Sequence, residues 1–247
     1  MRADPSQDMH VHSTFSDGKG TIAENVEAAR QQNLRTICLV DHVRVDTDWL
    51  PEFIAATDLL RRAEEGREHP IAIRRGVETK ILNRAGDLDL PADLSGLDHI
   101  LVADHQFPMA EGPLHPKEVL ALREQGAWAD ADLLEVLVEA TGNSLGPVAG
   151  SGILAHLFSV LPKAGLREDD VTPAALDWLA ARCAEHEVMV EVNERWNCPS
   201  ARSLSYFVRR GVGLVCSTDS HRVETIGIYD KVRATLRELD ALEEPSA

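Results

Sequence analysis

The feature that most constrains the fold is an alternation of short apolar segments with longer amphipathic ones. Seven segments have the length of a strand, are rich in Val, Ile and Leu, and are bounded by Gly, Pro or Asp. They are residues 9–13, 36–42, 71–81, 99–106, 152–156, 188–193 and 213–221. Strands that alternate with helices predict a parallel sheet, and near-continuous apolar strands predict that helices cover both of its faces.

Helical patterns lie between these strands. Residues 21–33 begin with Thr21 and Glu24 at the spacing of a capping box, and residues 50–65 carry Pro51 in the first turn. The others are residues 115–126, 131–142, 172–186, 203–211 and 229–244. Since a chain of 247 residues suits a closed barrel better than an open sheet, we predict a distorted (β/α)7 barrel, similar to a TIM barrel, in one domain over residues 1–247. A doubly wound open sheet is the alternative.

Composition narrows the class of protein. No apolar run approaches the ~18–20 residues of a membrane helix, and residues 1–8 lack the apolar region of a secretory signal. The 41 acidic and 25 basic residues give a net charge of −16, which disfavours binding to long nucleic acid or to an anionic membrane. The four cysteines have no paired spacing, and Cys38 and Cys216 lie inside apolar runs. We therefore expect a reduced, cytoplasmic protein. No oligomeric state is predicted.

Metal-type ligands occur at the C-terminal end of every predicted strand except the sixth, which delivers Asn193. They are His10 and His12, His42, Glu78, His105, His156, and Asp219 with His221. Parallel barrels place their chemistry at this end of the strands. Six of the ten histidines fall there, and histidines scattered through a core would not all choose one end. The sequence therefore predicts a metal site at the C-terminal rim.

The spacing of His10 and His12 fits this site. Alternate side chains of a strand face the same way, so both imidazoles can point into the barrel mouth while Val11 packs on the other side. The turn that follows can bring Asp17 over the same mouth, although Asp17 also suits a plain turn role. Asn193 has two roles open to it, capping the turn after the sixth strand or lining a substrate pocket.

The segments together resemble the PHP family, named for polymerase and histidinol phosphatase. Residues 8–18, DMHVHSTFSDG, are similar to the family's opening D-x-H-x-H motif. The segments VDH, GVETK, DHILVADH, ILAH, EVN and STDSHR follow in family order over residues 8–228. Leu157-Phe158 departs from the proline that commonly follows His156 in the family, which leaves the shape of that loop open. Since no added domain accompanies the motifs, the resemblance implies a stand-alone enzyme and not a polymerase module.

The resemblance implies a trinuclear metal site. His10, His12, Glu78 and Asp219 would hold one ion; Glu78, His105 and His156 would hold the second; Asp17, His42 and His221 would hold the third. We expect two to three divalent transition metals, with zinc, iron and manganese all suited to imidazole and carboxylate ligands. The set contains no cysteine, so a closed Cys-rich structural zinc site is disfavoured. Glu78, as the bridge, together with Asp219 and His221, would serve catalysis.

The implied reaction is hydrolysis of small phosphomonoesters. Three divalent cations carry more positive charge than the negative charge of the three carboxylates that would bind them. The site would therefore be locally positive within an acidic protein. A metal-bound hydroxide would attack phosphorus, and the cations would stabilise the transferring phosphoryl group. Five residues close to the strand ends are candidate substrate contacts. They are Lys80, Arg195, Arg44, Arg222 and Asn193.

Two other functions compete with this one. A metal-dependent amide or lactone hydrolase of the amidohydrolase type would be marked by a lysine on the fourth strand, where this sequence has His105. A non-catalytic metal- or phosphate-binding module would have lost ligands, and none is missing here. Among phosphoesters, histidinol phosphate, a nucleotide or another small ester all fit.

Overall fold

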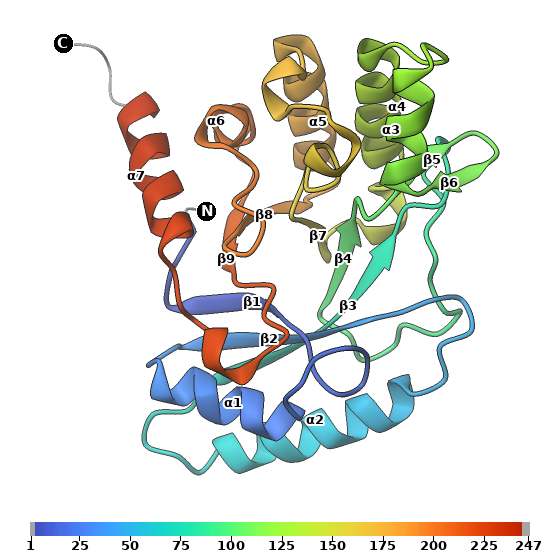
Figure 1. Cartoon of the computed structure of the whole chain (residues 1–247). Coiled ribbons are helices and arrows are strands. Elements are labelled where there is room, and N and C mark those ends of the chain that lie inside the picture. Colours follow the sequence, from blue (N-terminus) through green and yellow to red (C-terminus); the bar gives the residue numbers. More distant parts are fainter. Residues whose placement is uncertain (1–2, 244–247) are drawn as a thin grey trace.

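A curved sheet of seven parallel strands forms the centre of the computed structural model, which describes residues 3–243 (Figure 1). The strands are β1 (Gln7–Val11), β2 (Thr36–His42), β3 (Ala72–Lys80), β4 (His99–Ala103), β7 (Gly152–Ala155), β8 (Met189–Asn193) and β9 (Leu214–Ser217). They are hydrogen-bonded in this order, and every neighbouring pair is parallel. A doubly wound sheet reverses its strand order, so the sequential order confirms the barrel prediction and excludes the alternative.

The edge strands β1 and β9 approach each other and nearly close the sheet. Val11 forms a parallel bridge with Ser220, and the His12 amide donates to the Ser220 carbonyl at 2.8 Å. The fully buried Asp8 carboxylate accepts hydrogen bonds from the amide and hydroxyl of Thr218 at 2.9 and 2.6 Å. Residues from the two ends of the chain therefore meet at one rim.

Within residues 3–243 there are seven α-helices, six between strands and α7 after the last strand, as the sequence predicts. They are α1 (Ile22–Gln31), α2 (Leu50–Glu64), α3 (Pro116–Glu124), α4 (Asp130–Asn143), α5 (Pro173–Glu185), α6 (Ala201–Arg209) and α7 (Lys231–Glu243). Thr21 and Glu24 form the predicted capping box of α1. Residue 244, at the end of the last predicted helix, lies outside the described residues. Single 3-10 turns occur at η1 (Gly146–Val148), η2 (Pro162–Ala164), η3 (Glu168–Asp170) and η4 (Val223–Thr225).

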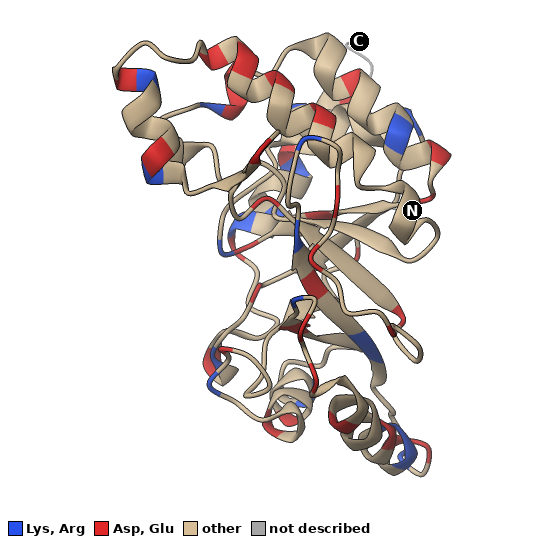
Figure 2. Cartoon of the chain, turned by 90° about the vertical axis from the view of Figure 1, so that its right-hand side faces the viewer, with Lys and Arg blue, Asp and Glu red and all other residues tan. Residues whose placement is uncertain are grey.

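The helices cover the outside of the sheet. In the view of Figure 1, α1 and α2 lie below β1 and β2, while α3 to α7 stand above the later strands. Figure 2 shows acidic and basic residues interspersed along these outer helices. No helix within residues 3–243 is long and apolar enough to cross a membrane.

The core divides into an inner part and an outer part. The inner part packs side chains of β1, β2, β4, β7 and β9 against one another; they are Met9, Cys38, Val40, Leu101, Ala103, Ile153, Ala155 and Val215. The outer part lies between the sheet and the helices, where Val11 packs with Ile22 and Val26 of α1. Val11 therefore faces outward, as predicted. Cys38 and Cys216 are fully buried, which confirms them as core residues.

Two features differ from the sequence prediction. A small antiparallel hairpin, β5 (Phe107–Met109) with β6 (Gly112–Leu114), was not expected. The first, fourth, fifth and seventh sheet strands end at Val11, Ala103, Ala155 and Ser217, earlier than the predicted segments. Five predicted ligands therefore stand on the loops that follow strands, which is where barrel enzymes carry their reactive groups; they are His12, His105, His156, Asp219 and His221. One domain over residues 1–247 stays a prediction, because residues 1–2 and 244–247 lie outside the described part.

Candidate metal centre

All nine predicted ligands come together at the C-terminal rim of the sheet. Three combinations of these side chains have ligand atoms close enough to share one ion. They are His10, His12 and Glu78; His42, Glu78 and His105; and His12, Asp17, His42 and His221. Two further ligands adjoin them, since His156 Nε2 lies 2.8 Å from Glu78 Oε1 and Asp219 Oδ1 lies 3.4 Å from His12 Nε2.

Glu78 occupies the middle of the cluster, on β3, and its side chain is only 1% exposed. Its Oε1 faces one pair of imidazoles, with His105 Nε2 at 3.1 Å and His156 Nε2 at 2.8 Å. Its Oε2 faces three others, with His42 Nδ1 at 2.9 Å and both His10 Nε2 and His12 Nε2 at 3.5 Å. The two oxygens of one carboxylate thus serve two separate groups of nitrogens, which is the arrangement of a bridging ligand.

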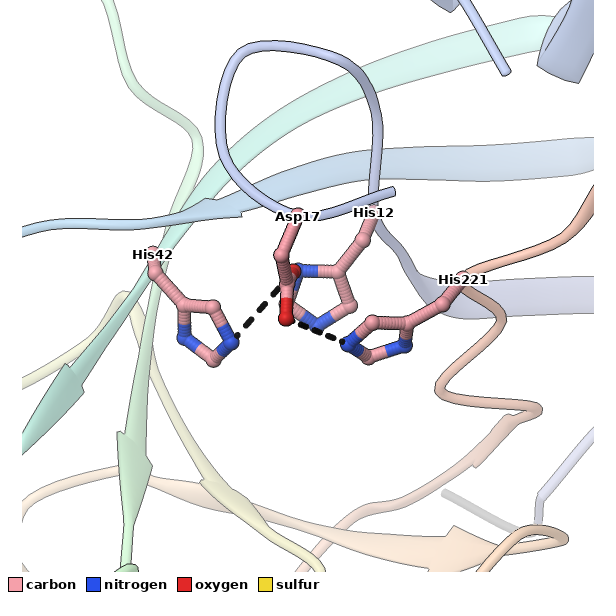
Figure 3. A group of neighbouring side chains, drawn as sticks. All are labelled: His12, Asp17, His42 and His221. Carbon is pink, nitrogen blue, oxygen red and sulfur yellow. Dashed lines mark ion pairs between the residues drawn. The ribbon is translucent and has the colours of Figure 1, made fainter. Parts of the chain in front are cut away.

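Asp17 completes a more open group, drawn in Figure 3. The loop after β1 carries it over His12, His42 and His221, with Asp17 Oδ2 3.2 Å from His221 Nε2 and Oδ1 3.6 Å from His42 Nε2. The Asp17 side chain is 54% exposed, so this group lies on the solvent side of the cluster.

Hydrogen bonds fix which nitrogen of two buried imidazoles faces the cluster. His10 Nδ1 lies 2.8 Å from Glu191 Oε1, and a carboxylate can only accept, so Nδ1 carries the proton. On the other side of the cluster, Ser159 donates to Asp104, so its oxygen accepts from His156 Nδ1 at 3.0 Å. Both rings therefore turn the lone pair of Nε2 inward, as metal-binding histidines do when the other nitrogen is held by an outer partner.

If the rings are neutral, hydrogen-bond acceptors of the cluster face one another. Such an arrangement is unfavourable unless a cation lies between them. With neutral imidazoles, the lone pair of His156 Nε2 would meet the Glu78 carboxylate at 2.8 Å, and His10 Nε2 lies 2.9 Å from His12 Nε2. Glu78 Oε2 and His12 Nδ1 are buried, and no hydrogen bond of acceptable geometry reaches either atom within the described chain. Buried polar atoms without partners are costly, and divalent ions bound by nitrogen and oxygen ligands would remove this cost for the atoms that face them. The residues present fit the implied metals.

The pKa shifts of the cluster's side chains also favour the binding of cations. Burial opposes protonation of His156, but hydrogen bonds with Asp104 and Glu78 outweigh it and raise its pKa to about 10, so without an ion a proton on Nε2 fills the contact with Glu78 that a cation would otherwise make. Burial would raise the pKa of Glu78, yet His105 and His10 hold it well below its usual range. Burial lowers the pKa of His12 to about 4. The carboxylates stay ionised and attract positive charge into the cluster, while His12 remains a neutral ligand.

Several residues of the site were missed by the sequence analysis. Glu191 on β8 is fully buried, and its second oxygen accepts from the backbone amide of His156 and from Asn193 Nδ2. The sequence feature that could have marked Glu191 is that it is a lone carboxylate inside an apolar strand, two residues before Asn193. Asp104 supports His156 through Ser159. The sequence feature that could have marked Asp104 is its position directly before His105.

Trp196 was also missed, and no pattern marked it. Its indole Nε1 donates to Asp219 Oδ2 at 2.7 Å. Its ring lies beneath the Lys163 ammonium, which is 3.9 Å from the ring centre, and is 37% exposed at the edge of the cluster. Trp196 therefore orients a predicted ligand and holds a cation beside it.

The predicted substrate contacts fall in different places. Arg195 Nη1 contacts His221 Nδ1 and lies 3.4 Å from Asp219 Oδ1, so it reaches the cluster. Lys80 instead pairs with Asp89 at 3.3 Å. Arg44 is exposed after β2, and Arg222 lies exposed beside His221.

Asn193 is buried, and both ends of its amide are engaged. Its Oδ1 accepts from the Trp196 amide at 2.9 Å, and its Nδ2 donates to Glu191. Of the two roles left open by the sequence, these contacts match the turn after β8.

Comparisons with known proteins give a consistent result. The family model described as the PHP domain matches residues 8–195. A "Probable phosphatase" of Clostridium acetobutylicum is 23% identical over 252 positions, covering 96% of this chain and 87% of that protein. A "Probable phosphatase" of Vibrio campbellii is 31% identical over 126 residues, 48% of each chain, so this match spans about half the length of that relative.

A solved structure shares the fold. It is histidinol phosphate phosphatase from Lactococcus lactis, complexed with zinc, L-histidinol and phosphate. The TM-score is 0.70 at 18% identity, and the match covers 96% of this chain and 93% of that one.

Proposed function

The chain belongs to the PHP domain family, and we propose on that basis that it is a metal-dependent phosphoesterase hydrolysing small phosphomonoesters. The observation that carries the proposal is the environment of Glu78. One buried carboxylate stands between five imidazoles, and each of its oxygens faces a different group of nitrogens. Such a cluster suits several adjacent divalent ions better than a single one.

We propose that three sets of side chains hold these ions. His10, His12, Glu78 and Asp219 form the first; Glu78, His105 and His156 the second; Asp17, His42 and His221 the third. Zinc, iron or manganese would fit these ligands. Bound ions would supply Lewis-acid charge to the phosphoryl oxygens and lower the pKa of water toward neutrality.

The protein's own residues would bind and orient the ester around this centre. Glu78 fixes the spacing between the two inner sets because it belongs to both. Asp219 and His221 sit at the opening, where Arg195 reaches them. An arginine there can contact the outer oxygens of a phosphate with two hydrogen bonds and position the ester for in-line attack.

The class of substrate is supported by charge and by the relatives. A net charge of −16 disfavours long nucleic acid, whereas a small phosphomonoester can enter a local positive site. The four cysteines are buried and unpaired, as in proteins of the reducing cytoplasm, and we propose that the enzyme acts there.

The test is a hydrolysis screen over a broad panel of small phosphomonoesters, with lactones and amides beside them. The protein is used with zinc, iron or manganese added separately, and the Glu78→Gln variant is the control. We expect release of phosphate from some esters by the wild type and none by the variant, since loss of the bridge disrupts both inner sets. Hydrolysis of lactones or amides alone would overturn the proposal.

A further inference from the structure

A cavity of about 370 Å³ opens directly beside the metal centre. Asp219 and His221 form one wall, the loop after β8 contributes Glu194 and Arg195, and the chain after β9 contributes Arg222 and Lys231. Because the cavity shares two proposed metal ligands, a substrate held at the ions would extend into it.

The cavity is rich in positive charge. Arg195, Arg222 and Lys231 all line it. The carboxylate of Glu194 is already used, because its two oxygens accept from the first amides of α7, those of Lys231 at 3.1 Å and Val232 at 2.9 Å. It therefore acts on the positive end of that helix more than on the side-chain cations of the cavity.

The remaining carboxylates do little to change this balance. Glu224 Oε2 lies 3.8 Å from Arg222 Nε, and the two side chains are 78% and 73% exposed, respectively. Because both are so exposed, this ion pair is weak. Asp219 would be neutralised by the bound ions. A local excess of cations in so acidic a chain points to a ligand of negative charge.

We infer that this cavity binds the leaving group of the substrate, and that this leaving group carries a second anion, a carboxylate or a second phosphate. The inference rests on the proposed phosphoesterase function and narrows its substrate class. Ile228 is 44% exposed and lines the same cavity, so it can contact the carbon skeleton between the two anions. A leaving group that carries an ammonium would meet three cations and be disfavoured.

Three esters of similar size separate these cases. 3-Phosphoglycerate has an anionic leaving group, glycerol 3-phosphate a neutral one, and phosphoethanolamine a cationic one. We expect kcat/KM to fall in that order, with roughly a tenfold advantage of phosphoglycerate over glycerol phosphate at low salt, because exposed charges interact modestly and are screened. The advantage should shrink at high ionic strength.

Single substitutions test whether the preference for an anionic leaving group comes from this cavity. Arg222→Gln and Lys231→Gln should each lower the ratio of kcat/KM for phosphoglycerate to that for glycerol phosphate, mainly through KM. Arg233→Gln, which removes an exposed cation of α7 that does not line the cavity, should leave the ratio unchanged. Equal use of the three esters, or a preference for phosphoethanolamine, would overturn the inference and leave the phosphoesterase function standing. Failure to hydrolyse any phosphomonoester would overturn both.

Discussion

At the scale of single residues, the centre depends on carboxylates that do not touch the proposed ions. Glu191 binds the outer nitrogen of His10 and also the backbone amide of His156. One buried side chain thereby fixes the tautomer of a ligand in the first set and the position of a ligand in the second. Loss of a group in this outer position typically lowers metal affinity by about 10–100-fold.

Replacing Glu191 by Gln tests this role. The amide preserves the shape but removes the charge that favours a protonated Nδ1 on His10, so we expect metal affinity to fall about 10–100-fold. Competition with a chromophoric chelator measures it. Glu185→Gln removes an exposed carboxylate of α5 that pairs with Arg182, and is the matched control. Unchanged affinity in Glu191→Gln would mean that His10 is oriented without this contact.

The sequence predicted which residues meet at the centre but not what supports them. His-x-His spacing and the strand-end rule place His10, His12 and His42 at one rim, because strand geometry is periodic. Glu191 and Asp104 carried a local signal, an acid in or beside an apolar strand. Trp196 carried none, because its hydrogen bond to Asp219 joins two loops whose approach is set by the packing of the whole barrel.

At the scale of elements, the loop between β1 and α1 is built to hold Asp17. Asp41, on β2, accepts hydrogen bonds from the backbone amides and hydroxyls of Ser13 and Ser16. The Lys19 amide donates to the His221 carbonyl at 2.8 Å. These contacts tie the loop to β2 and to the segment after β9, so Asp17 is positioned although its side chain is exposed.

Gly18 allows this loop to pass close to the backbone, and its replacement should remove one ion. A Cβ at Gly18 would lie 2.5 Å from the His12 carbonyl carbon and 2.6 Å from the Ser13 nitrogen, so the loop must move. We expect Gly18→Ala to lose the ion bound by Asp17, His42 and His221 and to keep those centred on Glu78, as elemental analysis would report. Gly66→Ala, where a Cβ meets nothing within 4 Å, is the control. Full metal content in Gly18→Ala would refute the assignment of Asp17.

The elements themselves were largely predictable, with one omission. Each sheet strand is an apolar run, and the α-helices follow amphipathic patterns. Side-chain caps begin α1, α3, α5 and α6, whereas α2 and α4 begin without one. The β5–β6 hairpin was not predicted because its strands have three residues each and because Pro108 and Pro113 lie opposite one another in it. Proline normally argues against a strand, and this hairpin is stabilised by its pairing and by the burial of Phe107 and Met109 in the core.

At the scale of the whole molecule, the barrel is what assembles the centre. The proposed ligands span the chain from His10 to His221, and they meet because β1 and the segment after β9 close against each other through Asp8, Thr218 and Ser220. No shorter part of the chain contains the complete set. Closure of the sheet and formation of the metal site are therefore expected to depend on one another, since an ion that binds only the folded state stabilises it.

The most direct test of this account is a metal titration of chelator-treated protein, with bound metal and phosphomonoester hydrolysis measured on the same samples. We predict no hydrolysis without metal, and activity that returns as about two to three zinc, iron or manganese ions bind per chain. Glu78→Gln, treated identically, should bind fewer ions and stay inactive. Metal-free wild-type protein that hydrolyses phosphomonoesters at the full rate would contradict the account.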